Sequence, residues 1–233
     1  MVVLHQFHMS PFNEKLQRMM RFKGVAFEEN YWRLTEQGKL KKKHNPTGKL
    51  PALEHDGHWV CDSTDVAHYI EENFPGPRLI PEDPAAAGLV HALEDWADES
   101  LYFYEMHMRF TTDRNWERNL PRMFERECWF MKSVLAGKMP GQIRKGIRKI
   151  TGTQGIGRKT EAQLLVDCRR HISAVAGMLN DSDFLVAGQL TLADLAVYAM
   201  FLCFLDTEEL ASIMSEYAAV GAWMSRVEQL TDG

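Results

Sequence analysis

The sequence has few cysteines and no closely spaced cysteine pair. The four that it has, Cys61, Cys128, Cys168 and Cys203, are scattered over 233 residues without a CxxC motif. Zinc sites and disulfide frameworks both need cysteines at set spacings, so this pattern argues against either one. We expect reduced, buried thiols and no metal.

Two further absences narrow the class of protein. No run is long and apolar enough to span a bilayer, and the first eight residues lack the basic start and apolar core of a signal peptide. A net charge of -5 gives no general reason to expect binding to nucleic acid or to a membrane. We therefore expect a cytoplasmic protein with one large domain or two small ones.

The stretch 45–57, NPTGKLPALEHDG, joins a turn to a strand. Its first four residues have turn composition, and its final Asp-Gly closes the extended segment. Pro51 has no N–H to give to a sheet, so it belongs at a strand's first residue or on an edge, where it leaves neighbouring backbone groups free for a ligand. Leu50-Pro51 is also a candidate cis peptide bond. An ordinary loop-to-strand proline fits the same spacing.

The first part of the chain alternates strands and helices. Ser10 and Pro11 form a helix start, and Asp62 with Ser63 caps a later helix. The expected elements are a strand at 2–7, a helix at 13–22, a strand at 27–32, a lysine-rich surface helix or loop at 35–44, strands from 53 and at 58–61, and a helix at 64–73. The first β-α-β unit implies a parallel strand pair.

A proline-rich stretch at 74–84 separates this part from a second, helical part. Its prolines exclude helix and sheet, which predicts a linker. Apolar residues then recur at helical spacing from Leu89 to Met108, and further helices are expected at about 116–136, 160–180, 191–205 and 210–230. We expect domains at 1–76 and 86–233, joined by a linker at 77–85.

The segment 138–159 interrupts the helical pattern. It carries seven lysines and arginines and no acidic residue. Its sequence GTQGIG at 152–157 resembles a phosphate loop only superficially, because the preceding strand is missing. We expect a solvated basic loop; the alternative is a site for a partner or an anion.

The chain as a whole resembles the soluble glutathione transferases. The motifs that carry the resemblance are Ser10-Pro11-Phe12, residues 45–53, Asp62-Ser63-Thr64, and residues 190–194 (LTLAD) ahead of an apolar helix. The resemblance implies a thioredoxin-like α/β domain (β-α-β-α-β-β-α) followed by an all-α helical bundle. The segment 152–158 is more similar to the helical domain of metaxin and failed-axon-connections relatives.

The resemblance also implies a glutathione site. Pro51 would be the cis-proline of the fold, with Leu50 pairing its backbone with the cysteinyl part, and Asp62 and Ser63 would hold the γ-glutamyl end. A helix N-terminus with a hydroxyl suits a carboxylate, and an acid suits an ammonium. The alternative is that Asp62 and Ser63 only cap the helix. Candidates for the glycyl carboxylate are Lys39, Lys49 and His44, although a lysine-rich surface explains them equally well.

Ser10 is the expected catalytic residue, because it stands where redox-active relatives carry Cys-Pro. Its hydroxyl can donate to the glutathione sulfur. Lowering a thiol pKa by about two units needs roughly 2.7 kcal/mol, and a hydrogen bond to a charged acceptor supplies about 1.5 to 3 kcal/mol. The alternative is a plain N-cap. Thr191 and Asp194 match the family's capping box, a structural role.

The family's electrophile site lies between the domains, beside an aromatic and methionine-rich stretch at 102–116. We expect Tyr104 and Met108 to line it, although such a stripe is more often core. The predicted activity is conjugation of glutathione to a small, largely apolar electrophile by a homodimer. The alternatives are a binding protein of this fold without turnover, and a glutathione-dependent isomerase or dehalogenase.

Overall fold

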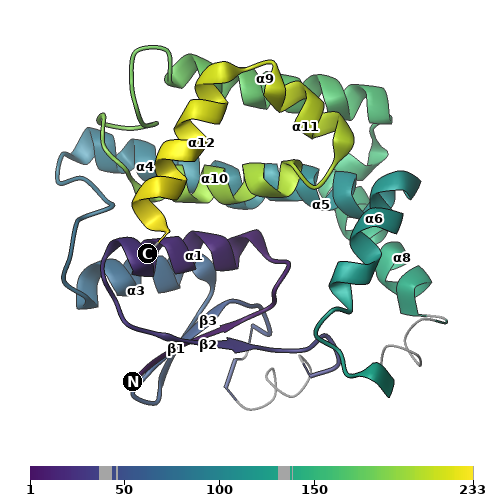
Figure 1. Cartoon of the computed structure of the whole chain (residues 1–233), viewed down its shortest axis with the longest axis horizontal. Coiled ribbons are helices and arrows are strands. Elements are labelled where there is room, and N and C mark those ends of the chain that lie inside the picture. Colours follow the sequence, from purple (N-terminus) through teal and green to yellow (C-terminus); the bar gives the residue numbers. More distant parts are fainter. Residues whose placement is uncertain (37–43, 46, 131–136, 138, 233) are drawn as a thin grey trace.

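The structure is a computed structural model that describes residues 1–36, 44–45, 47–130, 137 and 139–232. A sheet with two helices lies below a larger group of helices (Figure 1). No helix among the described residues has the length and hydropathy needed to cross a membrane.

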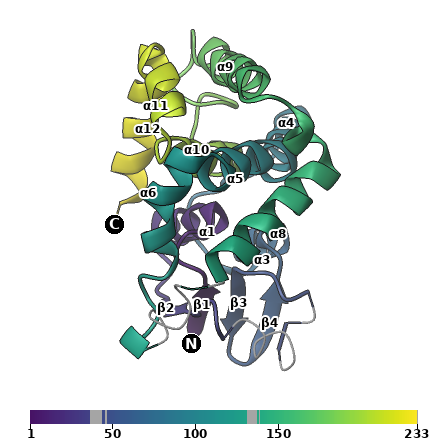
Figure 2. The same cartoon turned by 90° about the vertical axis from the view of Figure 1, so that its right-hand side faces the viewer.

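The sheet has the strand order β2-β1-β3-β4. Its strands are β1 (Val2–Gln6), β2 (Glu28–Tyr31), β3 (Ala52–His55) and β4 (His58–Cys61). β1 pairs with β2 in parallel and with β3 antiparallel, and β3 and β4 form a hairpin. The four strands lie side by side at the base of the molecule (Figure 2). The predicted strands and the parallel first pair are confirmed. The lysine-rich segment at 35–44 falls mostly outside the described residues.

Helices α1 (Pro11–Phe22) and α3 (Ser63–Asn73) cover the face of the sheet that is turned toward the helical part (Figure 1). The long helix α10 (Leu192–Phe204) packs on α1. It is buried along almost its whole length, which its nearly unbroken apolar sequence explains. The capping box of Thr191 and Asp194 forms as predicted.

The helical part contains further helices around α10. They are α4 (Pro84–Trp96), a π-helical segment (Ala97–Leu101), α5 (Tyr102–Thr111), α6 (Asp113–Met123), α8 (Met139–Gln154), a 3-10 turn (Ile156–Arg158), α9 (Glu161–Met178), α11 (Glu208–Ser215) and α12 (Ala218–Thr231). The predicted helix at 116–136 is interrupted after Met123, where α6 ends, and its last part, 131–136, lies outside the described residues. The stretch 210–230 is divided between α11 and α12.

The prediction of a basic loop at 138–159 is wrong, because most of this segment is helix α8. Ile143, Ile147 and Thr151 recur every four residues, and the two isoleucines pack against the methionine-rich cluster described below. Three glycines and the dense positive charge concealed this period in the sequence. The helix stands on the outer side of α5 (Figure 2).

Candidate active site

The loops that carry the predicted site residues meet at one end of the sheet. The first residue of β3 lies opposite His5 near the end of β1, and also opposite Cys61, the last residue of β4. The C-terminal end of β1, the N-terminal end of β3 and the C-terminal end of β4 therefore lie at the same end of the sheet. These three connections carry, in order, Ser10, then Leu50 and Pro51, then Asp62 and Ser63.

The segment before β3 leaves one residue of backbone free. The Leu50-Pro51 peptide bond is cis, and the N–H and C=O of Leu50 make no backbone hydrogen bond to any residue that the structure describes. Buried Asn45 fastens the preceding turn, since its side-chain oxygen accepts from the N–H of Gly48 at 3.0 Å and its amide donates to the carbonyl of Lys49. A fixed segment with an unpaired backbone suits an extended ligand.

Asp62 and Ser63 begin helix α3 in different roles. The Asp62 carboxylate accepts from the N–H of Thr64 at 3.1 Å, so it is the cap, and Lys49 Nζ lies 3.5 Å from its other oxygen. Asp62 has φ 97°, which residues with a side chain rarely adopt and which occurs most often at ligand sites. Ser63 is buried, and its hydroxyl donates to Asp98 at 3.4 Å. Only Asp62 acts as the cap.

Ser10 occupies the N-cap position of α1 with φ -84° and ψ 126°, but its side chain makes no capping hydrogen bond within the described helix. Its N–H donates to the carbonyl of Phe7 at 3.0 Å, and the side chain of Asn13 donates to the same carbonyl. The loop is thus held by backbone and amide contacts. The Ser10 hydroxyl is left at the positive end of α1, where an anion is favoured.

The three candidates for the glycyl carboxylate differ in position. Lys39 lies outside the described residues. His44 is exposed and stacks on Trp59, with ring centroids 4.6 Å apart. The Lys49 side chain is exposed and reaches toward Asp62. Of the two described side chains, His44 and Lys49, it is Lys49 that lies at the N-terminus of α3.

A buried charge cluster lies against the first turn of α3, and the sequence reasoning missed it. Lys15 on α1 is fully buried, with Nζ 2.6 Å from Glu94 Oε1 and 2.6 Å from Asp98 Oδ2. The hydroxyl of Thr64 donates to Glu94 at 2.9 Å, as that of Ser63 does to Asp98. One ammonium faces two carboxylates, so the cluster carries a formal charge of about -1 when all three groups are ionised.

Burial and charge separate the two carboxylates of this cluster. Burial raises the pKa of Asp98 to about 7, and Glu94 adds to this effect while Lys15 opposes it. Burial acts in the same direction on Glu94, but attraction to Lys15 and the hydrogen bonds it accepts outweigh it and hold the pKa of Glu94 below its ordinary value. Asp98 is therefore the member that exchanges a proton near neutral pH.

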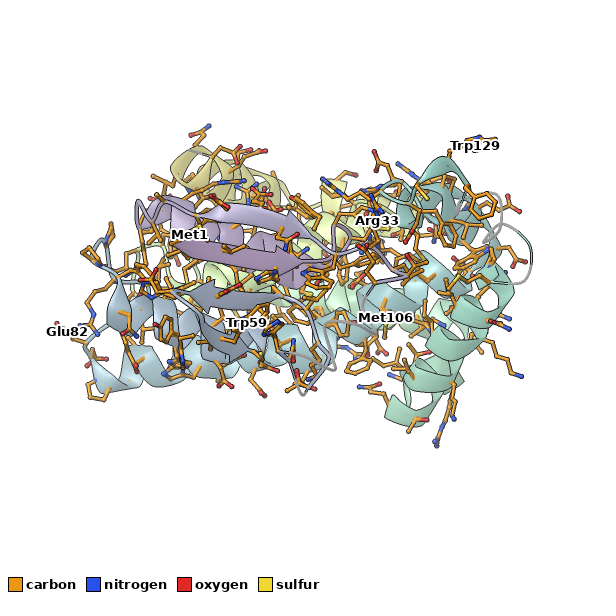
Figure 3. The ribbon with its side chains drawn as sticks, turned by 90° about the horizontal axis from the view of Figure 1, so that it is seen from below. Met1, Arg33, Trp59, Glu82, Met106 and Trp129 are labelled. Carbon is orange, nitrogen blue, oxygen red and sulfur yellow. The ribbon has the colours of Figure 1, made fainter. Side chains whose placement is uncertain are left out.

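An apolar cluster adjoins Ser10 through its neighbour Met9. This Met9 cluster consists of Met9, Met106, Phe110, Trp116 and Met123, with the half-buried Phe7, Tyr102, Phe103, Leu120, Ile143 and Ile147 packed against it. Met106 lies beyond the end of the sheet, on the side toward α8 (Figure 3). The cluster joins the loop after β1 to helices α5, α6 and α8.

Tyr104 and Met108 do not belong to the Met9 cluster. Met108 is fully buried in the main core, and the Tyr104 hydroxyl donates to Asp167 of α9 at 3.1 Å. Both lie on the face of α5 opposite to Met106 and Phe110, because successive helical residues are rotated by about 100°. Neither side chain therefore faces the Met9 cluster.

Part of the basic charge of α8 is used within the fold. Arg144 and Arg148 both donate to the carbonyl of Thr111 at the end of α5, at 2.6 and 3.1 Å, and Arg144 also pairs with Asp113. An open cleft of about 420 Å³ lies beside them, between α5, α8 and α9. None of the described residues of the predicted glutathione site lines it.

Two family models match this sequence. One, of the glutathione S-transferase N-terminal domain, matches residues 4–78, and one, of the glutathione S-transferase C-terminal domain, matches residues 144–230. The chain belongs to the glutathione S-transferase family. The helical part's likeness to metaxin relatives stays a prediction.

Named glutathione S-transferases agree with this placement. The chain is 44% identical to glutathione S-transferase L1 of Arabidopsis thaliana over 27% of this chain and 26% of that protein. It is 27% identical to glutathione S-transferase U7 of the same plant over 58% of this chain and 62% of that protein. The chain thus spans less than two thirds of the length of these curated relatives.

A solved glutathione S-transferase from Rhodospirillum rubrum has the same fold. It superposes with a TM-score of 0.65 at 19% identity, covering 98% of this chain and 88% of that one. Another glutathione S-transferase of similar fold, from Methylobacillus flagellatus, is described with glutathione bound.

Proposed function

We propose that this protein is an enzyme that conjugates glutathione to a small, largely apolar electrophile. The proposal is based on the three connections that meet at one end of the sheet. They bring the unpaired backbone of Leu50 and the N-termini of α1 and α3 to that end. The extended tripeptide would pair with Leu50 beside Pro51. Its γ-glutamyl end would bind to Asp62 and Ser63, and Lys49 would meet the glycyl carboxylate.

Ser10 would activate the sulfur. Its hydroxyl has no capping hydrogen bond within α1, and a donor at a helix N-terminus stabilises a thiolate through hydrogen bonding and through the helix dipole. The nucleophile is then glutathione itself. The protein supplies orientation and charge stabilisation without forming a covalent intermediate.

The apolar substrate would lie against the Met9 cluster. Tyr102, Phe103 and Ile147 are half-buried members of it and so still expose part of their surface. Methionine and aromatic side chains adapt to varied apolar shapes. We propose these residues for the electrophile pocket in place of Tyr104 and Met108, whose side chains pack elsewhere.

Ser10→Ala tests the catalytic proposal. We expect the thiol pKa of bound glutathione, measured by thiolate absorbance, to rise by about one to two units, since one charged hydrogen bond of about 1.5 to 3 kcal/mol is lost. Turnover with an aryl halide at pH 7 should fall correspondingly. Ser225→Ala, an exposed serine on α12, is the control. An unchanged thiol pKa and rate in Ser10→Ala would show that Ser10 is only a helix start.

Three broader features also belong to this proposal. Residues 1–76 would form the glutathione-binding domain and residues 86–233 the helical domain, with 77–85 between them. The protein would act in the cytoplasm. It would form a homodimer, and light scattering would test this by measuring its mass in solution. No described feature favours the isomerase, dehalogenase or non-catalytic alternatives over a transferase.

A further inference from the structure

The single hydroxyl hydrogen of Ser63 has two competing acceptors. In the structure it is directed to Asp98 Oδ2 at 3.4 Å, whereas the proposed function requires it to reach the carboxylate of a ligand. A serine hydroxyl has one donor and two acceptor positions. The two side chains can stay hydrogen-bonded while Ser63 serves the ligand only if Asp98 donates, and an ionised carboxylate has no hydrogen to give.

We propose that Asp98, held by Lys15, is a positioning residue that takes up one proton from solvent when a carboxylate binds at Ser63. The Asp98 hydroxyl then donates to Ser63 Oγ, and the serine hydrogen turns to the ligand. The inference rests on the proposed function, because it takes the ligand to be the γ-glutamyl end of glutathione. The only covalent change is the O–H bond formed on Asp98.

The buried charges favour uptake over release. Lys15 is the one cation facing Glu94 and Asp98 in the described part of the chain, so the site already has an excess of negative charge before a ligand carboxylate arrives. Asp98 Oδ1 is buried and has no hydrogen-bond partner among the described residues. Protonation neutralises the cluster and lowers the cost of that unsatisfied oxygen.

Several elements pack around Asp98 and supply its polar and charged neighbours. Helix α1 contributes Lys15, α4 contributes Glu94, and α3 contributes two hydroxyl groups. Helices α5 and α10 also pack on the π-helical segment that carries Asp98. The acid of α5, Glu105, pairs with Arg109. The acid of α10, Asp194, is engaged by its own capping box and by Trp223. Burial raises the pKa of Asp98 to about 7, so the proton exchanges in the range where the experiment is done.

Calorimetry with S-methylglutathione tests the inference on the wild-type protein. This thioether keeps the γ-glutamyl end but has no thiol whose ionisation would release a proton. Titrations at pH 7 in two buffers of different ionisation enthalpy give the number of protons exchanged. We expect uptake of up to about half a proton per site, because a group with a pKa near 7 is about half protonated there. Affinity should fall, by at most about tenfold, from pH 7 to pH 8.

Asp98→Asn distinguishes positioning from a structural role. Asparagine does not titrate in this pH range, so proton uptake should disappear. The fall in affinity between pH 7 and pH 8 should disappear as well. Asp95→Asn, which changes an exposed acid on α4, should keep the wild-type uptake.

Each alternative result is decisive. Wild-type binding with no proton uptake, or with net release, overturns the inference and leaves the proposed function standing. A folded Asp98→Asn variant that keeps the wild-type proton uptake also overturns it. No binding of S-methylglutathione to the wild type overturns the proposed function and the inference together.

Discussion

Lys15 Nζ and Asp98 Oδ2 lie 2.6 Å apart in the interior. Lys15 comes from the first helix after the sheet's first strand, and Asp98 comes from the π-helical segment that follows α4. With Glu94, this contact ties the helix that begins at Ser10 to the helix that begins at Ser63. A charge cluster therefore connects the two helix N-termini of the proposed site to the helical part of the chain.

Lys15→Met should destabilise the protein by about 3 to 5 kcal/mol. Removing the ammonium leaves two buried carboxylates without their cation, which is the costly way to break a buried ion pair. Urea unfolding measures the free energy. Lys145→Met, on the exposed side of α8, should change it by less than about 0.5 kcal/mol. A loss below about 1 kcal/mol in Lys15→Met would mean that the cluster does not stabilise the fold.

Glu105 should make stability depend on pH. It is fully buried beside Arg109, and burial raises the pKa of Glu105 from 4.5 to about 6, with Arg109 opposing the shift. The folded state therefore holds the proton more strongly than the unfolded state. The contribution of this group to the free energy of unfolding should decrease by about 2 kcal/mol as pH rises from 4.5 through 6.

Urea unfolding of wild type and Glu105→Gln at pH 4.5 and pH 7 tests this dependence. The free energy of unfolding of the wild type minus that of the variant should fall with rising pH, because glutamine does not titrate. A difference that stays constant, or that grows with pH, would contradict the raised pKa.

Gly146→Ala should stabilise the protein by about 0.5 to 1 kcal/mol. Gly146 is inside helix α8, and a Cβ there would meet nothing within 4 Å, so alanine gains helix propensity without a clash. Gly155→Ala is the matched comparison. Its φ of 117° penalises a side chain, and we expect it to destabilise. Equal, near-zero effects of the two variants on thermal unfolding would argue against a helix at 139–154.

Local signals explain what the sequence could predict. The turn, proline and strand around Pro51, and the cap at Asp62, are fixed by residues next to one another, and the structure confirms those elements. The ion pairs of Lys15 could not be predicted from the sequence, because its partners lie 79 and 83 positions away. Its burial depends on the packing of α4 against α1, which no local pattern reveals.

Helix orientation explains the other differences. Tyr104 and Met108 lie in the predicted stretch, but choosing the face of α5 that meets Met9 requires knowing how the helix is rotated. In α8, the run of lysines and arginines without an acidic residue suggested a loop, although Ile143 and Ile147 already had helical spacing. In both cases tertiary packing, and not composition, determines which residues meet.

Titration of the protein with glutathione, compared with Ser63→Ala, tests the central claim most directly. We predict micromolar to low-millimolar binding by the wild type, weakened in the variant by more than about 1 kcal/mol, the size of a lost hydrogen bond to a charged group. Ser225→Ala should bind like the wild type. Equal affinity of Ser63→Ala and the wild type would place the ligand elsewhere, and absence of binding to the wild type would contradict the glutathione site at this end of the sheet.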